Sequence, residues 1–136
     1  MVHIDITYDG DLHCTQTHRP SGTRIVTDAP KDNGGKGESF SPTDLVASAL
    51  GSCMMTIMGI VAKRHLISLQ GTKVEVIKEM IQEPVRRIGK LTVRFQMPKG
   101  IAESQRKLLE RAALTCPVHQ SLHPDIQIPV SFDYPD

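Results

Sequence analysis

The stretch that most constrains the fold of this chain is residues 41–66, SPTDLVASALGSCMMTIMGIVAKRHL. It opens with a helix-start signal, because the Ser41 hydroxyl can accept a hydrogen bond from an N–H of the first turn and Pro42 has no N–H to leave unsatisfied. Asp44 stands three residues after the cap, as in a capping box. Residues 45–62 include no charge. A helix that is apolar on all sides is usually buried, so this segment predicts one long central helix.

The same apolar run has to be weighed against a membrane span. Its length is at the lower limit for crossing a bilayer, about 18 residues. It also includes several hydroxyls and glycines, and it starts with a cap typical of soluble proteins. We therefore expect a buried helix and no membrane partner. The small residues along the helix allow close approach of another element, for which a second copy of the same helix is a candidate.

Length and composition limit the remaining possibilities. A chain of 136 residues is expected to form a single domain, residues 1–136. The net charge of +1 gives no reason to expect a nucleic acid as partner. No signal peptide or lipidation motif opens the sequence, which predicts a cytoplasmic protein. The three cysteines are an odd number, which argues against a framework of structural disulfides in a reducing compartment.

Alternation of apolar and polar residues predicts strands in the rest of the chain. The first three form an antiparallel meander, and residues 29–39 form a glycine-containing loop that leads into the long helix. A second helix is predicted over residues 101–116, ended by Pro117. The predicted strands are residues 2–8, 12–17, 23–27, 72–81, 89–97 and 126–132. This pattern predicts an α+β fold with antiparallel sheets packed against the central helix.

The cysteines are the main candidates for chemistry. Cys53 and Cys116 each lie on the apolar side of a predicted helix, where a free cysteine is most often a small core residue. The alternative is a redox pair that only the fold brings together. Cys116 and His119 have the spacing of half a metal site, but the chain lacks a matching second half, so no metal is predicted. A hydrolytic Cys116 with His119 has no supporting motif. Cys14 is most simply structural.

Two motifs carry a resemblance to a known family. The string FSPTDLVASALGSCM, followed later by CPVH, resembles the OsmC/Ohr family of osmotically induced and organic hydroperoxide resistance proteins. The resemblance covers nearly the whole chain and is greatest to the broader OsmC-like branch. It implies an OsmC-like α+β fold and an intertwined homodimer.

The resemblance also implies a chemistry. Cys53 would be the peroxidatic cysteine of a thiol peroxidase that acts on organic hydroperoxides, and Cys116 would be the resolving cysteine. A small dithiol, such as a protein-bound lipoyl group, would regenerate the thiols, and no cofactor is expected. The alternative is a non-enzymatic OsmC-like protein that binds a small apolar ligand or senses oxidation. An enzyme would consume peroxide repeatedly with a dithiol, whereas a sensor or binder would react once or not at all.

A reactive Cys53 would need a nearby cation. Apolar surroundings raise the pKa of a thiol, and Cys53 lies roughly 18 Å along the helix from its N-terminus, too far for the helix dipole to help. In the family the cation is an arginine from the N-terminal half, held by a glutamate. The resemblance makes Arg19 the first choice and Arg24 the second. The acid would be Glu38 or Asp44, because this chain departs from the family's Pro-Glu-Glu-Leu motif.

Overall fold

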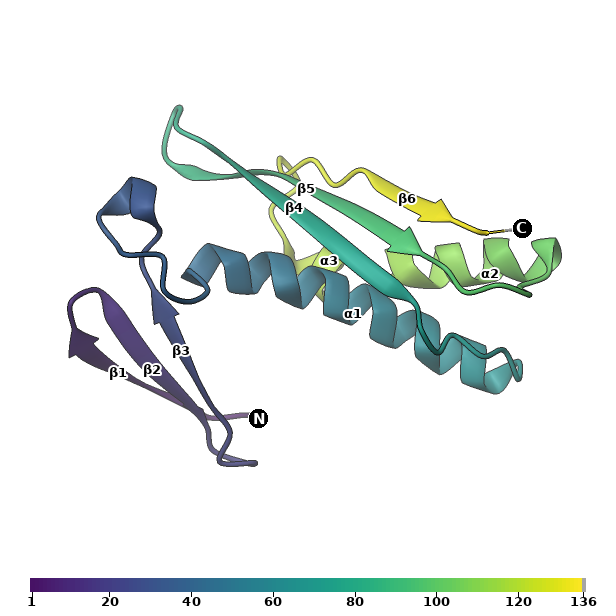
Figure 1. The fold of residues 1–136 in the computed structure, drawn as a ribbon, viewed down its shortest axis with the longest axis horizontal. Coiled ribbons are helices and arrows are strands. Elements are labelled where there is room, and N and C mark those ends of the chain that lie inside the picture. Colours follow the sequence, from purple (N-terminus) through teal and green to yellow (C-terminus); the bar gives the residue numbers. More distant parts are fainter. Residues whose placement is uncertain (136) are drawn as a thin grey trace. The chain divides into compact units, whose positions relative to one another are not determined.

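A computed structural model describes residues 1–135 of the chain (Figure 1). Among these residues the strands form two three-stranded sheets, which confirms the predicted α+β class. The chain divides into two compact units, Met1–Val46 and a second that begins at Ala47. A single domain over residues 1–136 therefore stays a prediction. The elements are β1 Ile4–Gly10, β2 His13–His18, β3 Arg24–Asp28, the 3₁₀ turn η1 Lys31–Asn33, α1 Pro42–Arg64, β4 Lys73–Ile81, β5 Arg87–Gln96, α2 Glu103–Leu114, α3 Pro117–Ser121 and β6 Val130–Asp133.

The first unit contains the predicted meander. β1 pairs with β2, and β2 pairs with β3, both antiparallel. The turn between β1 and β2 uses left-handed backbone at Gly10, Asp11 and Leu12. The alternation in β1 predicts a half-buried strand, but its apolar side chains Ile4, Ile6 and Tyr8 are 59%, 66% and 63% exposed. Within the first unit this apolar face is therefore uncovered.

The start of α1 is fixed by the predicted capping box. The backbone N–H of Asp44 donates to the Ser41 hydroxyl at 3.1 Å, and the Ser41 N–H donates to Asp44 Oδ2 at 2.9 Å. Both hydrogen bonds satisfy N–H groups that have no partner within the helix. The helix ends after Arg64, where Leu66 has left-handed backbone and the Ile67 N–H bonds the Ala62 carbonyl at 2.9 Å.

The second unit is built on the sheet β4-β5-β6. β4 and β5 form an antiparallel hairpin, in line with the expected antiparallel sheets, whereas β6 runs parallel to β5. The reason is the connection, since α2 and α3 carry the chain back before β6 begins, and a crossover of this kind returns a strand parallel to the one it left. The residues of α1 from Ala47 onward and α2 lie on the same face of the sheet (Figure 1).

One face of α1 supplies much of the core of the second unit. Leu50, Met54 and Met58, spaced four residues apart, are fully buried. The opposite face, which includes Thr56 and Ile60, is exposed. The helix is therefore buried on one side in a single chain, and the expected all-round burial is not reached there. Sheet side chains that complete the core are Leu91, Val93 and Phe95, and Phe95 also stacks on Phe132 at 4.8 Å.

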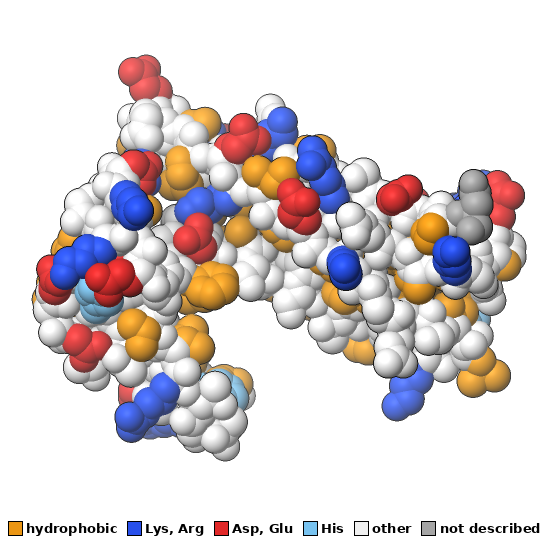
Figure 2. Space-filling model, in the orientation of Figure 1, with side chains coloured by type: hydrophobic (Ala, Val, Ile, Leu, Met, Phe, Trp, Pro, Cys, Tyr) orange, Lys and Arg blue, Asp and Glu red, His pale blue; other side chains and the backbone are white. Residues whose placement is uncertain are grey.

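By length and composition α1 could cross a membrane. The central helix of a soluble protein meets the same criterion, so this finding is weak support for a span. Acidic and basic side chains are interspersed over the face drawn in Figure 2, and neither sign gathers into one patch there. On the outside of the hairpin they pair across strands, with Arg94 3.8 Å from Glu75 and Lys90 3.9 Å from Glu79.

Candidate functional site

Cys53 lies in the middle of α1, between its buried and exposed faces, and is partly exposed. Two residues earlier, Gly51 faces strand β4. A Cβ at Gly51 would lie 2.8 Å from Val76 Cγ2 and 3.4 Å from Val74 Cγ1, which is closer than ordinary packing allows. Glycine therefore lets the helix backbone approach β4.

Cys116 is fully buried between the two shorter helices. The prediction that helix α2 extends to Cys116 and is ended by Pro117 is wrong. α2 ends at Leu114, and Pro117 is the first residue of a new helix, α3, because proline fits the first turn. Cys116 is the N-cap of α3, and its Sγ accepts a hydrogen bond from the His119 N–H at 3.2 Å.

The two thiols of the second unit interact. All three cysteines are free, and Cys53 lies close enough to Cys116 to act on its ionisation. Burial raises the pKa of the Cys116 thiol, the hydrogen bond from the His119 N–H opposes that rise, and the Cys53 side chain adds to it. Cys116 is therefore a protonated thiol at neutral pH. Cys14 lies in the first unit, on β2, opposite Tyr8 on β1 and Thr27 on β3.

The arginines predicted to activate Cys53 both lie in the first unit. The Arg19 guanidinium donates to both carboxylate oxygens of Asp5, at 2.6 and 2.8 Å, and both side chains are more than half exposed. Arg24 begins β3 and is exposed. The sequence had pointed to Glu38 or Asp44 as the acid that holds the arginine, but the carboxylate bound to Arg19 here is Asp5. The roles of Arg19, Arg24 and Glu38 toward Cys53 stay predictions.

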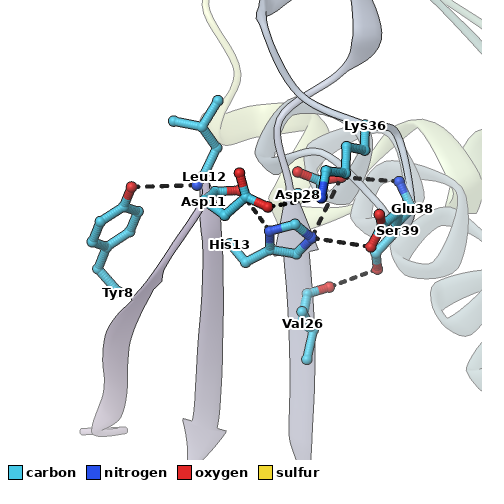
Figure 3. Close-up of polar contacts among 9 residues, drawn as sticks. All are labelled: Tyr8, Asp11, Leu12, His13, Val26, Asp28, Lys36, Glu38 and Ser39. Atoms are coloured by element: carbon cyan, nitrogen blue, oxygen red, sulfur yellow. Dashed lines mark hydrogen bonds and ion pairs between the residues drawn. The ribbon is translucent and has the colours of Figure 1, made fainter.

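A polar cluster that sequence reasoning missed lies in the first unit. His13 Nε2 is 3.5 Å from Asp28 Oδ2 and 3.4 Å from Glu38 Oε2 (Figure 3). His13 and Asp28 are register partners on β2 and β3. The strand prediction included His13 but ended at residue 27, one residue before Asp28, and without the register nothing placed the two opposite each other. Sequence analysis looked for a metal only at Cys116 and His119.

The family follows from comparison with known sequences and structures. The OsmC family model, described as OsmC-like protein, matches residues 35–131. This chain belongs to the OsmC-like family. A solved structure from Psychrobacter arcticus 273-4, described as an osmotic stress induced and detoxification response protein, matches this OsmC-like protein with a TM-score of 0.92. The two sequences are 44% identical, and the match covers 98% of this chain and 96% of that one.

More distant structures share the fold. An OsmC-like protein from Mycoplasma pneumoniae matches with a TM-score of 0.82 at 16% identity, covering 98% of this chain and 96% of that one. The organic hydroperoxide resistance protein OhrB of Bacillus subtilis matches with a TM-score of 0.73 at 14% identity, covering 98% of each chain. Comparison with curated proteins finds no match. The predicted OsmC-like fold is thus confirmed.

Proposed function

We propose that this OsmC-like protein is a thiol-dependent peroxidase that reduces organic hydroperoxides, with Cys53 as the peroxidatic and Cys116 as the resolving cysteine. The observation that carries the proposal is the interaction of two free thiols distant in sequence, one partly exposed and the other buried. Family membership supports it. So do the names of fold relatives from Legionella pneumophila, Elizabethkingia anophelis and Bacillus subtilis, which are organic hydroperoxide resistance proteins.

In the first step the Cys53 thiolate attacks one oxygen of the hydroperoxide. A sulfur–oxygen bond forms, the O–O bond breaks, and the alkoxide leaves and takes up a proton to become the alcohol. Cys53 is left as a sulfenic acid. Because Cys53 is the more exposed of the two cysteines and Cys116 has the raised pKa, Cys53 is the better placed nucleophile.

In the second step Cys116 attacks the sulfenic sulfur, a disulfide forms and water leaves. The charge of a Cys53 thiolate contributes to the raised pKa of Cys116. Oxidation of Cys53 to the neutral sulfenic acid removes that smaller contribution, whereas burial, the main cause of the raised pKa of Cys116, remains. The His119 N–H, 3.2 Å from Sγ, then stabilises the resolving thiolate.

A dithiol completes the cycle. It transfers two electrons to the Cys53–Cys116 disulfide by thiol–disulfide exchange and is itself left as a disulfide. A protein-bound lipoyl group is the reductant that the family resemblance implies. We place Arg19 first and Arg24 second as the cation that stabilises the Cys53 thiolate. Glu38, or Asp44 in its place, is the supporting acid, and Asp5 is a further one because it already binds Arg19.

We also propose that the active form is a cytoplasmic homodimer. Two apolar faces are uncovered in one chain: the outer side of β1, at Ile4, Ile6 and Tyr8, and the α1 face that includes Ile60. The α1 face also carries the small side chains of Ser48, Ala49 and Ser52, all exposed, which permit close helix contact. In a two-fold dimer, the same face of a second copy would cover each of these faces.

The test is peroxide consumption with dithiothreitol or a lipoyl dithiol as reductant. Wild type should turn over an alkyl hydroperoxide many times, and more efficiently than hydrogen peroxide. Cys53→Ser should fall to the background rate, whereas the matched control Cys14→Ser should keep the wild-type rate. Consumption of a single equivalent by wild type would instead support the oxidation sensor, and no consumption at all would support the ligand binder.

A further inference from the structure

Three side chains from separate segments of the first unit meet around one point. His13 comes from β2, Asp28 is the last residue of β3, and Glu38 lies in the loop before α1 (Figure 3). One ligand atom from each lies within 4.8 Å of the others. The proposed peroxidase chemistry does not use this group as a unit, so its arrangement requires a separate explanation.

The His13 ring is oriented by the backbone. Its Nδ1 lies 2.6 Å from the Asp11 carbonyl oxygen. A carbonyl can only accept a hydrogen bond, so Nδ1 carries a proton and donates it. In the neutral ring Nε2 then has a free lone pair, and this atom faces the carboxylates of Asp28 and Glu38. Metal-binding histidines are commonly oriented in this way, with one ring N–H on a carbonyl and the other nitrogen on the metal.

The separations between the three groups fit ligands of one ion. Nε2 is 3.5 Å from Asp28 Oδ2 and 3.4 Å from Glu38 Oε2. Hydrogen bonds between an imidazolium and a carboxylate are shorter, about 2.7–2.9 Å. Two ligands at about 2.05 Å from a tetrahedral Zn²⁺ lie about 3.3 Å apart. The exposed Glu38 side chain is free to turn and close the remaining gap to Asp28.

Asp28 adds an independent observation. The residue is 1% exposed, and its Oδ1 has no hydrogen-bond partner within residues 1–135. Its Oδ2 accepts the Glu38 N–H at 3.0 Å. A buried carboxylate is costly unless hydrogen-bond donors or cations lie near it, and here the Lys36 side chain and the backbone N–H groups of Ala29 and Lys36 also act on Asp28.

We propose that His13, Asp28 and Glu38 bind a divalent late first-row metal ion, Zn²⁺ in the first place. An imidazole nitrogen favours Zn²⁺ over Mg²⁺ and Ca²⁺, which prefer oxygen ligands alone. Three protein ligands leave a fourth position open to water or to a small anion. The ion ties the loop before α1 to β2 and β3 of the meander. The competing occupant of the same space is a proton, which would make His13 an imidazolium between two carboxylates.

The test is calorimetric titration of the reduced full-length chain with ZnCl₂, repeated with CoCl₂ under an absorption spectrometer. Wild type should bind one ion per chain. His13→Gln and Asp28→Asn should weaken binding at least about tenfold. Glu38→Gln, which alters an exposed side chain and so leaves folding undisturbed, should weaken it as well. The matched control is His18→Gln, an exposed histidine on the same strand, and it should bind as wild type does.

The cysteine thiols could also bind the metal ion, and the cobalt spectrum distinguishes binding at thiols from binding at the proposed site. A site of nitrogen and oxygen ligands gives no thiolate-to-cobalt charge-transfer band, and binding should persist in the Cys53→Ser, Cys116→Ser double variant. The proposal is overturned if wild type binds no ion, if Glu38→Gln and His13→Gln bind as wild type does, or if the spectrum shows thiolate ligands. The first of these results would leave the proton as the occupant.

Discussion

The packing of α1 on β4 gives a prediction that can be worked through quantitatively. Replacing Gly51 with alanine adds a Cβ that would lie 2.8 Å from Val76 Cγ2, a distance that real Cβ contacts essentially never show. Val76 is on a strand whose backbone is held by the β4–β5 ladder, so it cannot simply move away. Gly51→Ala should therefore strain the contact between α1 and β4.

Two opposing terms determine the size of the effect. Alanine is a better helix former than glycine by about 1 kcal/mol. Overpacking a filled core costs about 1–3 kcal/mol. The free energy of unfolding should therefore fall by about 0–2 kcal/mol in Gly51→Ala. The small net value makes the single variant a weak test, so a double-mutant cycle with Val76→Ala is the appropriate design.

The cycle isolates the steric term. Val76→Ala removes the atom that the new Cβ would meet, so in that background Gly51→Ala should gain up to about 1 kcal/mol from helix propensity. The coupling energy should be about 1–3 kcal/mol. Urea unfolding of all four proteins, reduced and at one protein concentration, measures it, since dimer formation would otherwise change the apparent stability. A coupling energy near zero would refute the close approach of α1 to β4.

Three further predictions concern the thiols and the assembly. Arg19→Ala should slow alkylation of Cys53 at neutral pH far more than at high pH. Equal slowing at both pH values would indicate that Arg19 has a steric role. An effect seen only in Arg24→Ala would show that Arg24 is the cation that stabilises the Cys53 thiolate. The pKa of Cys116 is raised in the folded state, so the unfolded chain loses the Cys116 thiol proton at a lower pH than the folded chain does. The free energy of unfolding should therefore decline as the pH rises above the ordinary thiol pKa of 9.0. In urea unfolding, Cys116→Ala should not show this decline. Light scattering should give about 30 kDa, twice 15.0 kDa, and a stable folded species of 15.0 kDa at micromolar concentration would contradict the dimer.

Local signals in the sequence predicted the elements well. The capping residues Ser41 and Asp44 fixed the start of α1, and alternation located the strands, because both depend on neighbours along the chain. The role of Pro117 was misjudged, since proline is equally suited to following one helix and to starting another. The direction of β6 also depends on a connection through two helices, which alternation within the strand does not record.

The candidate site could be predicted only in part from the sequence. The interaction of Cys53 with Cys116 came from a family resemblance, because spacing alone could not bring together two residues on different elements. The group of His13, Asp28 and Glu38 depends on strand register and on the path of a loop. The partner of Arg19 was missed for the same reason, since Asp5 meets it across the meander.

The most direct test of the central claim is peptide mapping after oxidation of the reduced protein with one equivalent of an organic hydroperoxide. The account predicts a Cys53–Cys116 cross-link and a free Cys14 thiol. A disulfide needs Cα atoms about 4.4–6.8 Å apart. In Cys116→Ser, oxidation should stop at the Cys53 sulfenic acid and proceed further with excess peroxide. Survival of Cys53 as a free thiol, or a cross-link from Cys53 to Cys14, would contradict the account.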